Sequence, residues 1–164
     1  MFALCGYWSK PKSTTRWEGE ETMSGNALIT VNYGLSVEDA VEIGRYDWAN
    51  NDITSKNFPT TQTGKAEVVL EPIHFNCYIS TKDAPLKLDR MGYRPAELHE
   101  LLAFGEKYQN VQREFPIVAL GSVWHQRGGR RVPCLYGDSS GRVLGLLWVG
   151  RAWPKISRFA AVCK

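Results

Sequence analysis

The sequence predicts an α+β domain, and three observations support this class. A β-branched run near residue 30 precedes a segment with helical periodicity, two helix-like segments follow one another between residues 80 and 109, and the last forty residues contain only strand and turn patterns. A chain of 164 residues can bury one apolar core without metal or disulfide staples. We therefore expect two helices packed on short antiparallel strands with long irregular loops.

The composition is that of an ordinary globular protein, with 43% hydrophobic and 23% charged residues. No apolar run approaches the roughly 18 residues that a membrane span needs, and the N-terminus lacks the apolar region of a signal peptide. We expect a cytoplasmic protein without a membrane partner. The cysteines Cys5, Cys77, Cys134 and Cys163 form no CxxC pair, so we expect reduced thiols, no metal and no cofactor.

Residues 1–25 lack an apolar period and are expected to form a flexible arm, followed by a strand-helix-strand extension at 26–72. The run ALITVNYGL favours a strand because it is rich in β-branched residues. Ser36 and Asp39 then have the spacing of a helix cap, before an apolar side that extends to Trp48. The stretch KAEVVLEPIHFNCYI predicts a second strand region, broken near Pro72.

Two helices are expected next. Ser80 and Asp83 again fit a cap, and Gly92 is a suitable stop for the first helix. Pro95 occupies a favoured first position for the second helix, in the run AELHELLAFGEKYQN. The apolar residues of this second helix recur at helical spacing at Leu98, Leu101, Leu102, Phe104 and Tyr108.

The C-terminal part is expected to contain a buried strand at 116–124 and then several short strands separated by glycine-rich turns. In the run VLGLLWV, alternation predicts that Leu144, Leu146 and Trp148 face the core. The opposite face of this strand, which begins at Val143, would be either a displayed surface or a second buried face. Alternation alone does not distinguish these two arrangements.

The charge is asymmetric along the chain. Residues 125–164 hold eight Arg and Lys against Asp138 alone, a net charge of +7, whereas residues 1–124 carry −4. A basic tail with several Trp and Tyr residues has the composition of a nucleic-acid surface, so binding of nucleic acid or another anion is the alternative function. No RNA-binding, zinc or helix-turn-helix motif accompanies it.

Catalytic motifs are scarce. The histidines His74, His99 and His125 are far apart in sequence, and neither a GxSxG elbow nor a glycine-rich phosphate loop is present. Glu97 and Glu100 share a helix with apolar residues, and we expect them to solvate it rather than to act as an acid and base pair. The sequence therefore predicts a protein that is not an enzyme.

Two stretches resemble bacterial C-type lectin fold domains, the group that includes formylglycine-generating enzyme-like proteins. GYRPAELHELLAFG resembles the start of their second helix, and FPIVALGSVW with the closing RFAAV resembles their core and last strands. The resemblance covers 73–164. Within that fold, the chain is most similar to the variable proteins of diversity-generating retroelements, in which selected codons of the C-terminal segment are rewritten while the scaffold stays fixed.

This resemblance implies a ligand-binding surface within a variable region at about 124–157. A protein ligand is expected first and a carbohydrate less so. Calcium-dependent sugar binding is not expected, because the carboxylate-rich calcium motifs of lectins are missing and the tail offers one carboxylate. The expected contact residues are His125, Gln126, Arg127, Arg131, Tyr136, Asp138, Val143, Gly145, Leu147, Val149, Arg151, Lys155 and Ile156.

Overall fold

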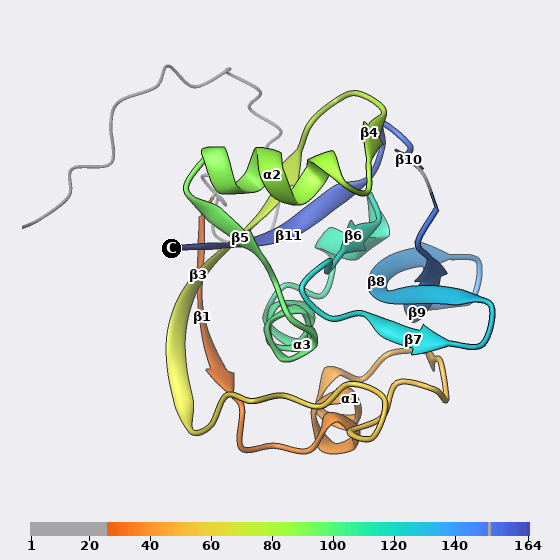
Figure 1. The fold of residues 1–164 in the computed structure, drawn as a ribbon. Coiled ribbons are helices and arrows are strands. Elements are labelled where there is room, and N and C mark those ends of the chain that lie inside the picture. The colour runs from red at the N-terminus through yellow and green to blue at the C-terminus, as the bar shows by residue number, and fades with distance from the viewer. Residues whose placement is uncertain (1–25, 151) are drawn as a thin grey trace, which may run out of the picture.

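The computed structural model describes residues 26–150 and 152–164, and within them the fold is α+β, as predicted. The expected arm at 1–25 lies outside these residues. A nine-stranded sheet has the central order β1-β3-β11-β6-β8-β9-β2, with β5 added beside β11 and β7 beside β8 (Figure 1). Its strands are β1 (Ala27–Asn32), β2 (Trp48–Ala49), β3 (Lys65–His74), β5 (Tyr93–Pro95), β6 (Ile117–Val118), β7 (Trp124–Gln126), β8 (Gly129–Asp138), β9 (Gly141–Trp148) and β11 (Arg158–Cys163).

Two layers cover this sheet. The remaining elements are the helices α1 (Val37–Gly44), α2 (Asp83–Arg90) and α3 (Leu98–Lys107), the 3-10 helix η1 (Val111–Arg113), and the strands β4 (Ile79–Ser80) and β10 (Ala152–Trp153) of a two-stranded sheet. Along β11, Ala160 and Val162 face one apolar cluster with α1 and α3, whereas Phe159 and Ala161 face a second cluster with α2, β4 and β10. The large sheet therefore separates two buried clusters.

The local signals for helix ends are confirmed. The Ser36 hydroxyl accepts a hydrogen bond from the Asp39 amide at the start of α1. The Ser80 hydroxyl accepts from the Asp83 amide at the start of α2, and Gly92 follows that helix with a φ of 86°. A positive φ suits glycine because it has no Cβ, so Ser36 marks the start of α1, and Ser80 and Gly92 flank α2.

The predicted role of Pro95 is wrong, because Pro95 belongs to β5 and α3 begins three residues later. Pro95 pairs with Ala161 of β11, and the Ala96 amide donates to the Ala160 carbonyl at 2.8 Å. The chain therefore stays extended until Glu97, which forms a capping box with Glu100. Pairing with the last strand overrides the favoured first position of proline in a helix.

Two further predictions are corrected. Pro72 does not break β3. The pairing of β3 with β1 ends at Leu70, so at Pro72 the strand has a partner only on the side of β11. A proline, which lacks an amide hydrogen, is tolerated at such a position. The helix of the N-terminal part ends at Gly44, so Trp48 lies in β2 and is 49% exposed rather than on an apolar helix side. The boundary expected at residue 72 falls inside β3, and residues from both sides of it share one core cluster.

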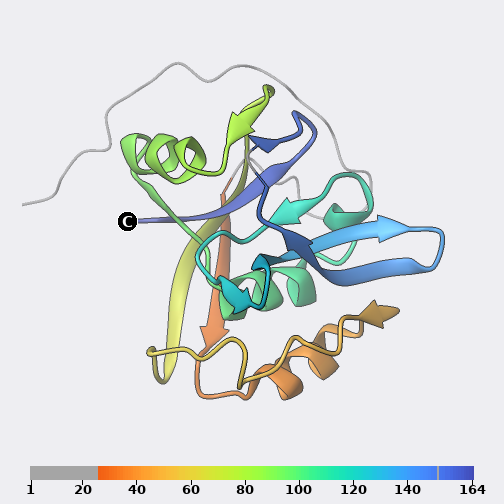
Figure 2. The same cartoon turned by 45° about the vertical axis from the view of Figure 1, so that its right-hand side comes forward.

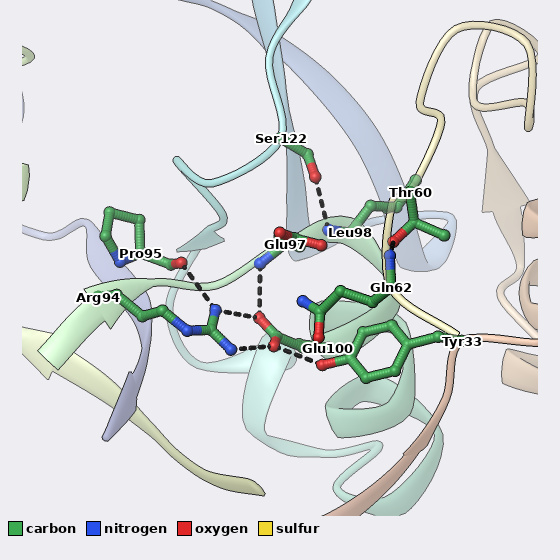
Figure 3. A network of polar contacts seen from close by, with 9 residues as sticks. All are labelled: Tyr33, Thr60, Gln62, Arg94, Pro95, Glu97, Leu98, Glu100 and Ser122. Atoms are coloured by element: carbon green, nitrogen blue, oxygen red, sulfur yellow. Dashed lines mark hydrogen bonds and ion pairs between the residues drawn. The ribbon is translucent and has the colours of Figure 1, made fainter. Parts of the chain in front are cut away.

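A buried polar network holds the start of α3 (Figure 3). The Glu100 carboxylate is fully buried and accepts from the Tyr33 hydroxyl at 2.7 Å, from both terminal nitrogens of Arg94 at 2.5 and 3.0 Å, and from the Glu97 amide at 2.7 Å. The expectation that Glu100 solvates the helix is therefore wrong. Burial and the hydrogen bond to Glu100 raise the pKa of Tyr33, and the same carboxylate raises the pKa of Arg94.

Candidate ligand-binding surface

The segment expected to bind ligand forms three adjacent antiparallel strands, β7, β8 and β9. Trp124 pairs with Arg131, and Arg131 pairs with Trp148, so these three residues lie side by side on one face. The turn between β7 and β8 and the last residues of β9 lie at the same end of this unit. Figure 2 shows the β8–β9 hairpin in blue, and these residues lie at the end opposite to its turn at 139–140. We call this end, Trp124 to Arg131 with Leu147 to Val149, the hairpin surface.

Six of the expected contact residues belong to the hairpin surface. His125, Gln126 and Arg127 are exposed, whereas Arg131, Leu147 and Val149 are half-buried. His125 pairs with Arg130 on the opposite face of the strand from Trp124. The chain thus gathers polar, basic and apolar side chains at one end, where the three exposed residues lie outside both apolar clusters and Leu147 and Val149 pack against the second one.

Trp148 departs from its expected place. It shares a face with Leu144 and Leu146, as the alternation predicts, but it is 52% exposed while Leu144 is fully buried. The apolar cluster formed with α1 and α3 includes Leu144 and has Leu146 packed against it, but it does not extend to the end of β9. Trp148 is therefore a surface residue, and its assignment to the core is wrong.

Val143 and Gly145 also differ from the expectation of a displayed face, because both are buried. The second apolar cluster covers this side of the hairpin through Val132 and Cys134 of β8. Tyr136 covers Gly145 directly, since a Cβ at that glycine would lie 2.8 Å from Cε1 of the tyrosine ring. The first half of β9 is thus buried on both faces, which is the alternative that alternation left open.

Gly145→Ala is expected to destabilise the fold by about 1–2 kcal/mol, because the added methyl group must displace the Tyr136 ring. The measurement is the free energy of unfolding in urea. In a Tyr136→Ala background the same change is expected to cost close to zero, since alanine suits a strand better than glycine once the ring is gone. An equal cost in both backgrounds would contradict this contact.

The loop between β10 and β11 brings Lys155 and Ile156 to a separate part of the surface. Both are exposed, Ile156 at 60%. A ring nitrogen of His74 lies 2.6 Å from the Lys155 carbonyl, and β10 pairs with β4. Tyr78, next to β4, is 75% exposed and is a surface aromatic that the sequence analysis did not identify. Arg151 lies outside the described residues.

Asp138 and Tyr136 lie away from the hairpin surface. Asp138 is exposed at the far end of β8, seven residues beyond Arg131, where it accepts hydrogen bonds from the hydroxyl and the amide of Ser140. These hydrogen bonds lower the pKa of Asp138. Tyr136 is half-buried, and burial raises the pKa of its hydroxyl. The twelve expected contact residues that the structure describes therefore do not form one continuous site.

Only part of the basic tail is available to a ligand. Arg142 is 4% exposed and donates to backbone carbonyls of four residues, including Gly105 at 2.7 Å. Lys164 pairs with Asp89, and Arg158 is half-buried with its guanidinium carbon 3.8 Å from the centre of the Phe115 ring. Burial lowers the pKa of both Arg142 and Arg158. Among the described residues of the tail, the exposed cations outside an ion pair are Arg127 and Arg130 near the turn between β7 and β8, and Lys155 on the loop between β10 and β11.

The three histidines occupy different places in the fold. His99 is buried with Nε2 3.1 Å from the Leu35 carbonyl, His74 contacts the loop at Lys155, and His125 is exposed on β7. Residues 26–150 and 152–164 contain no cluster of three His, Cys, Asp or Glu side chains arranged to hold a metal ion. None of the helices in these residues is both long and apolar enough to cross a membrane. Comparison of the chain with protein-family models, curated proteins and solved structures finds no match.

Proposed function

We propose that this chain is a non-catalytic, receptor-like binding protein with a C-type lectin fold, the variable protein of a diversity-generating retroelement. The observation that carries the proposal is the hairpin surface, where His125, Gln126 and Arg127 are exposed beside half-buried neighbours. Rigid strands support these positions, and the loops and strand ends that carry them tolerate substitution at small cost. Such a surface can change its ligand without losing its scaffold.

The arrangement of the elements that carry the resemblance supports the same proposal. The buried strand expected at 116–124 is shorter than predicted, because β6 comprises Ile117–Val118 only, and it lies between α3 and β11 along the chain. β11 pairs in parallel with β6 and is antiparallel to β3. Phe159 and Val118 pair in this register and are both fully or almost fully buried, so the closing RFAAV stretch is part of the scaffold.

A protein ligand fits the hairpin surface better than the nucleic-acid alternative does. Exposed aromatic and arginine side chains are the residues that dominate protein interfaces. A nucleic acid needs a run of available cations along its phosphates, whereas Arg142 and Lys164 are already engaged by carbonyls and by Asp89. We therefore retain nucleic acid only as an outcome that the binding experiments must test.

Sequencing of the DNA around the gene is expected to find an imperfect copy of codons 124–164 beside a reverse-transcriptase gene. Mismatches should replace adenines in codons of exposed positions such as His125, Gln126 and Ile156, because changes there cost little stability. The codons of Leu144 and Phe159 serve as the matched control, since both side chains are buried. The absence of a copy, or mismatches concentrated in buried codons, would refute a diversified surface.

A further inference from the structure

We propose that Arg131, which lies over the ring of Trp148, binds a carboxylate in an acidic segment of the protein ligand. This inference rests on the proposed function and names the chemistry of the partner at the hairpin surface. The guanidinium carbon of Arg131 lies 4.1 Å from the centre of the Trp148 ring. Arg131 is half-buried, and its Nε is buried without a hydrogen-bond partner among the described residues.

Gly129 helps to fix this stack. A Cβ at Gly129 would lie 2.7 Å from Cζ3 of Trp148, so only glycine lets the indole lie this close to β8. The indole packs closely against Gly129 with the guanidinium of Arg131 over its ring, while half of the tryptophan surface remains exposed. A guanidinium that is already oriented loses less conformational freedom when it binds, and its planar set of N–H groups matches the two oxygens of a carboxylate.

The charge around the stack favours an acidic partner. Arg127 and Arg130 are exposed on the same turn and strand. Among the described residues, the ion pairs join Arg94 to Glu100 and Lys164 to Asp89, so none of these three arginines is paired with an acidic side chain. Arg127 and Arg131 with the exposed indole, and Arg130 on the opposite face of β8, complement a short segment that combines acidic and apolar side chains.

The positively charged area at the hairpin surface is small, and it therefore fits a short acidic peptide better than a nucleic acid. The described basic residues of the tail outside this turn are buried, engaged, or, like Lys155, on a different loop. A long phosphate backbone would find few further cations along β8 and β9, because Arg142 donates to carbonyls inside the core. A short acidic segment needs only the hairpin surface.

The test uses fluorescence anisotropy with a labelled peptide of about twelve residues that alternates Glu and Gly and has an amidated C-terminus. We expect it to bind the full chain at least tenfold more tightly than the matching Gln and Gly peptide does. A Gln and Gly peptide with a free C-terminus carries a single carboxylate, at its end. Its affinity shows whether the surface binds a C-terminal carboxylate rather than the carboxylates of Glu side chains. Equal binding of the Glu and Gln peptides would overturn the proposal.

Arg131→Lys is expected to weaken binding of the Glu peptide by roughly tenfold, because lysine keeps the charge but cannot form the bidentate hydrogen bonds of a guanidinium with a carboxylate. Arg90→Lys is the matched control, with the same chemical change at an exposed arginine of α2 outside the hairpin surface, and should change the affinity by less than about twofold. Trp148→Leu should weaken binding as well, whereas Trp148→Phe should restore part of it. Equal losses for the two lysine variants would overturn the role of the stack.

Single-stranded DNA of similar charge is the last probe. Tighter binding of an oligothymidine than of the Glu peptide, with a steep dependence on salt, would overturn the acidic protein partner in favour of nucleic acid. The binding measurements do not depend on whether the segment is diversified. Failure of the peptide to bind would leave the DNA copy and its mismatches unaffected, and the absence of a copy would leave carboxylate binding unaffected.

Discussion

Replacing Glu100 by Leu is expected to destabilise the fold by roughly 2–4 kcal/mol. The substitution removes the acceptor of the Tyr33 hydroxyl and the ionic partner of Arg94. Loss of one member of a fully buried pair costs about 3–5 kcal/mol. The Arg94 side chain is 35% exposed and can turn towards water, which reduces this cost. The measurement is thermal unfolding, with an expected decrease in Tm of about 5–15 °C.

Glu100→Gln is the matched control, because an amide oxygen still accepts from Tyr33 and the shape is conserved. Its loss should be smaller than that of Glu100→Leu. Adding Arg94→Met to the leucine variant should recover part of the stability, since no unpaired charge then remains. If Glu100→Leu unfolds at the same temperature as the parent protein, the buried network contributes nothing and our account of this helix start is wrong.

Features that depend on neighbouring residues could be predicted from the sequence. Ser36 caps α1 through the amide of Asp39, and Gly92 follows α2 with a positive φ. Each of these interactions spans at most a few residues, so the pattern itself contains both partners. The α+β class follows for the same reason, because the periodicities of helices and strands are local.

Long-range contacts explain the failures. Tyr33 lies 67 residues from Glu100 in the chain, and nothing near GYRPAELHE reveals that the carboxylate will be buried. Pro95 has the sequence signal of a helix start, but pairing with Ala161 keeps it in a strand. At Pro95 and Glu100, tertiary contacts overrode the preference that the local sequence indicates.

The candidate surface illustrates a different limit. Alternation correctly places Trp148 on the face of Leu144 and Leu146, yet it contains no information on where the covering helices end. It likewise cannot indicate that Val132 and Cys134 belong to a second buried cluster on the other face. Periodicity identifies the faces of a strand, whereas exposure depends on the layers packed against it. The hairpin surface could therefore be identified only once the structure showed which residues these layers cover.

Arg142 provides the second large effect, and it concerns how the β8–β9 hairpin is attached to the helices. Its guanidinium donates to the Gly44 carbonyl at the end of α1 and to the Gly105 carbonyl in the last turn of α3. Cations are favoured at the C-terminal ends of helices, where unpaired carbonyls and the helix dipole create a negative potential. One side chain of β9 therefore joins the strand to both helices.

Arg142→Met is expected to destabilise the fold by about 4 kcal/mol or more, because it leaves several buried carbonyls without donors. Arg142→Lys should cost less, about 2–3 kcal/mol, since one ammonium keeps the charge but reaches fewer carbonyls. Urea unfolding of both variants measures these losses, with Arg127→Lys as the matched exposed control. The essential result is that the loss in free energy of unfolding is largest for Arg142→Met, smaller for Arg142→Lys and smallest for the control. If Arg142→Lys were as harmless as Arg127→Lys, the guanidinium would not be joining the hairpin to the helices, and the rigid support on which the proposed surface depends would have to come from elsewhere.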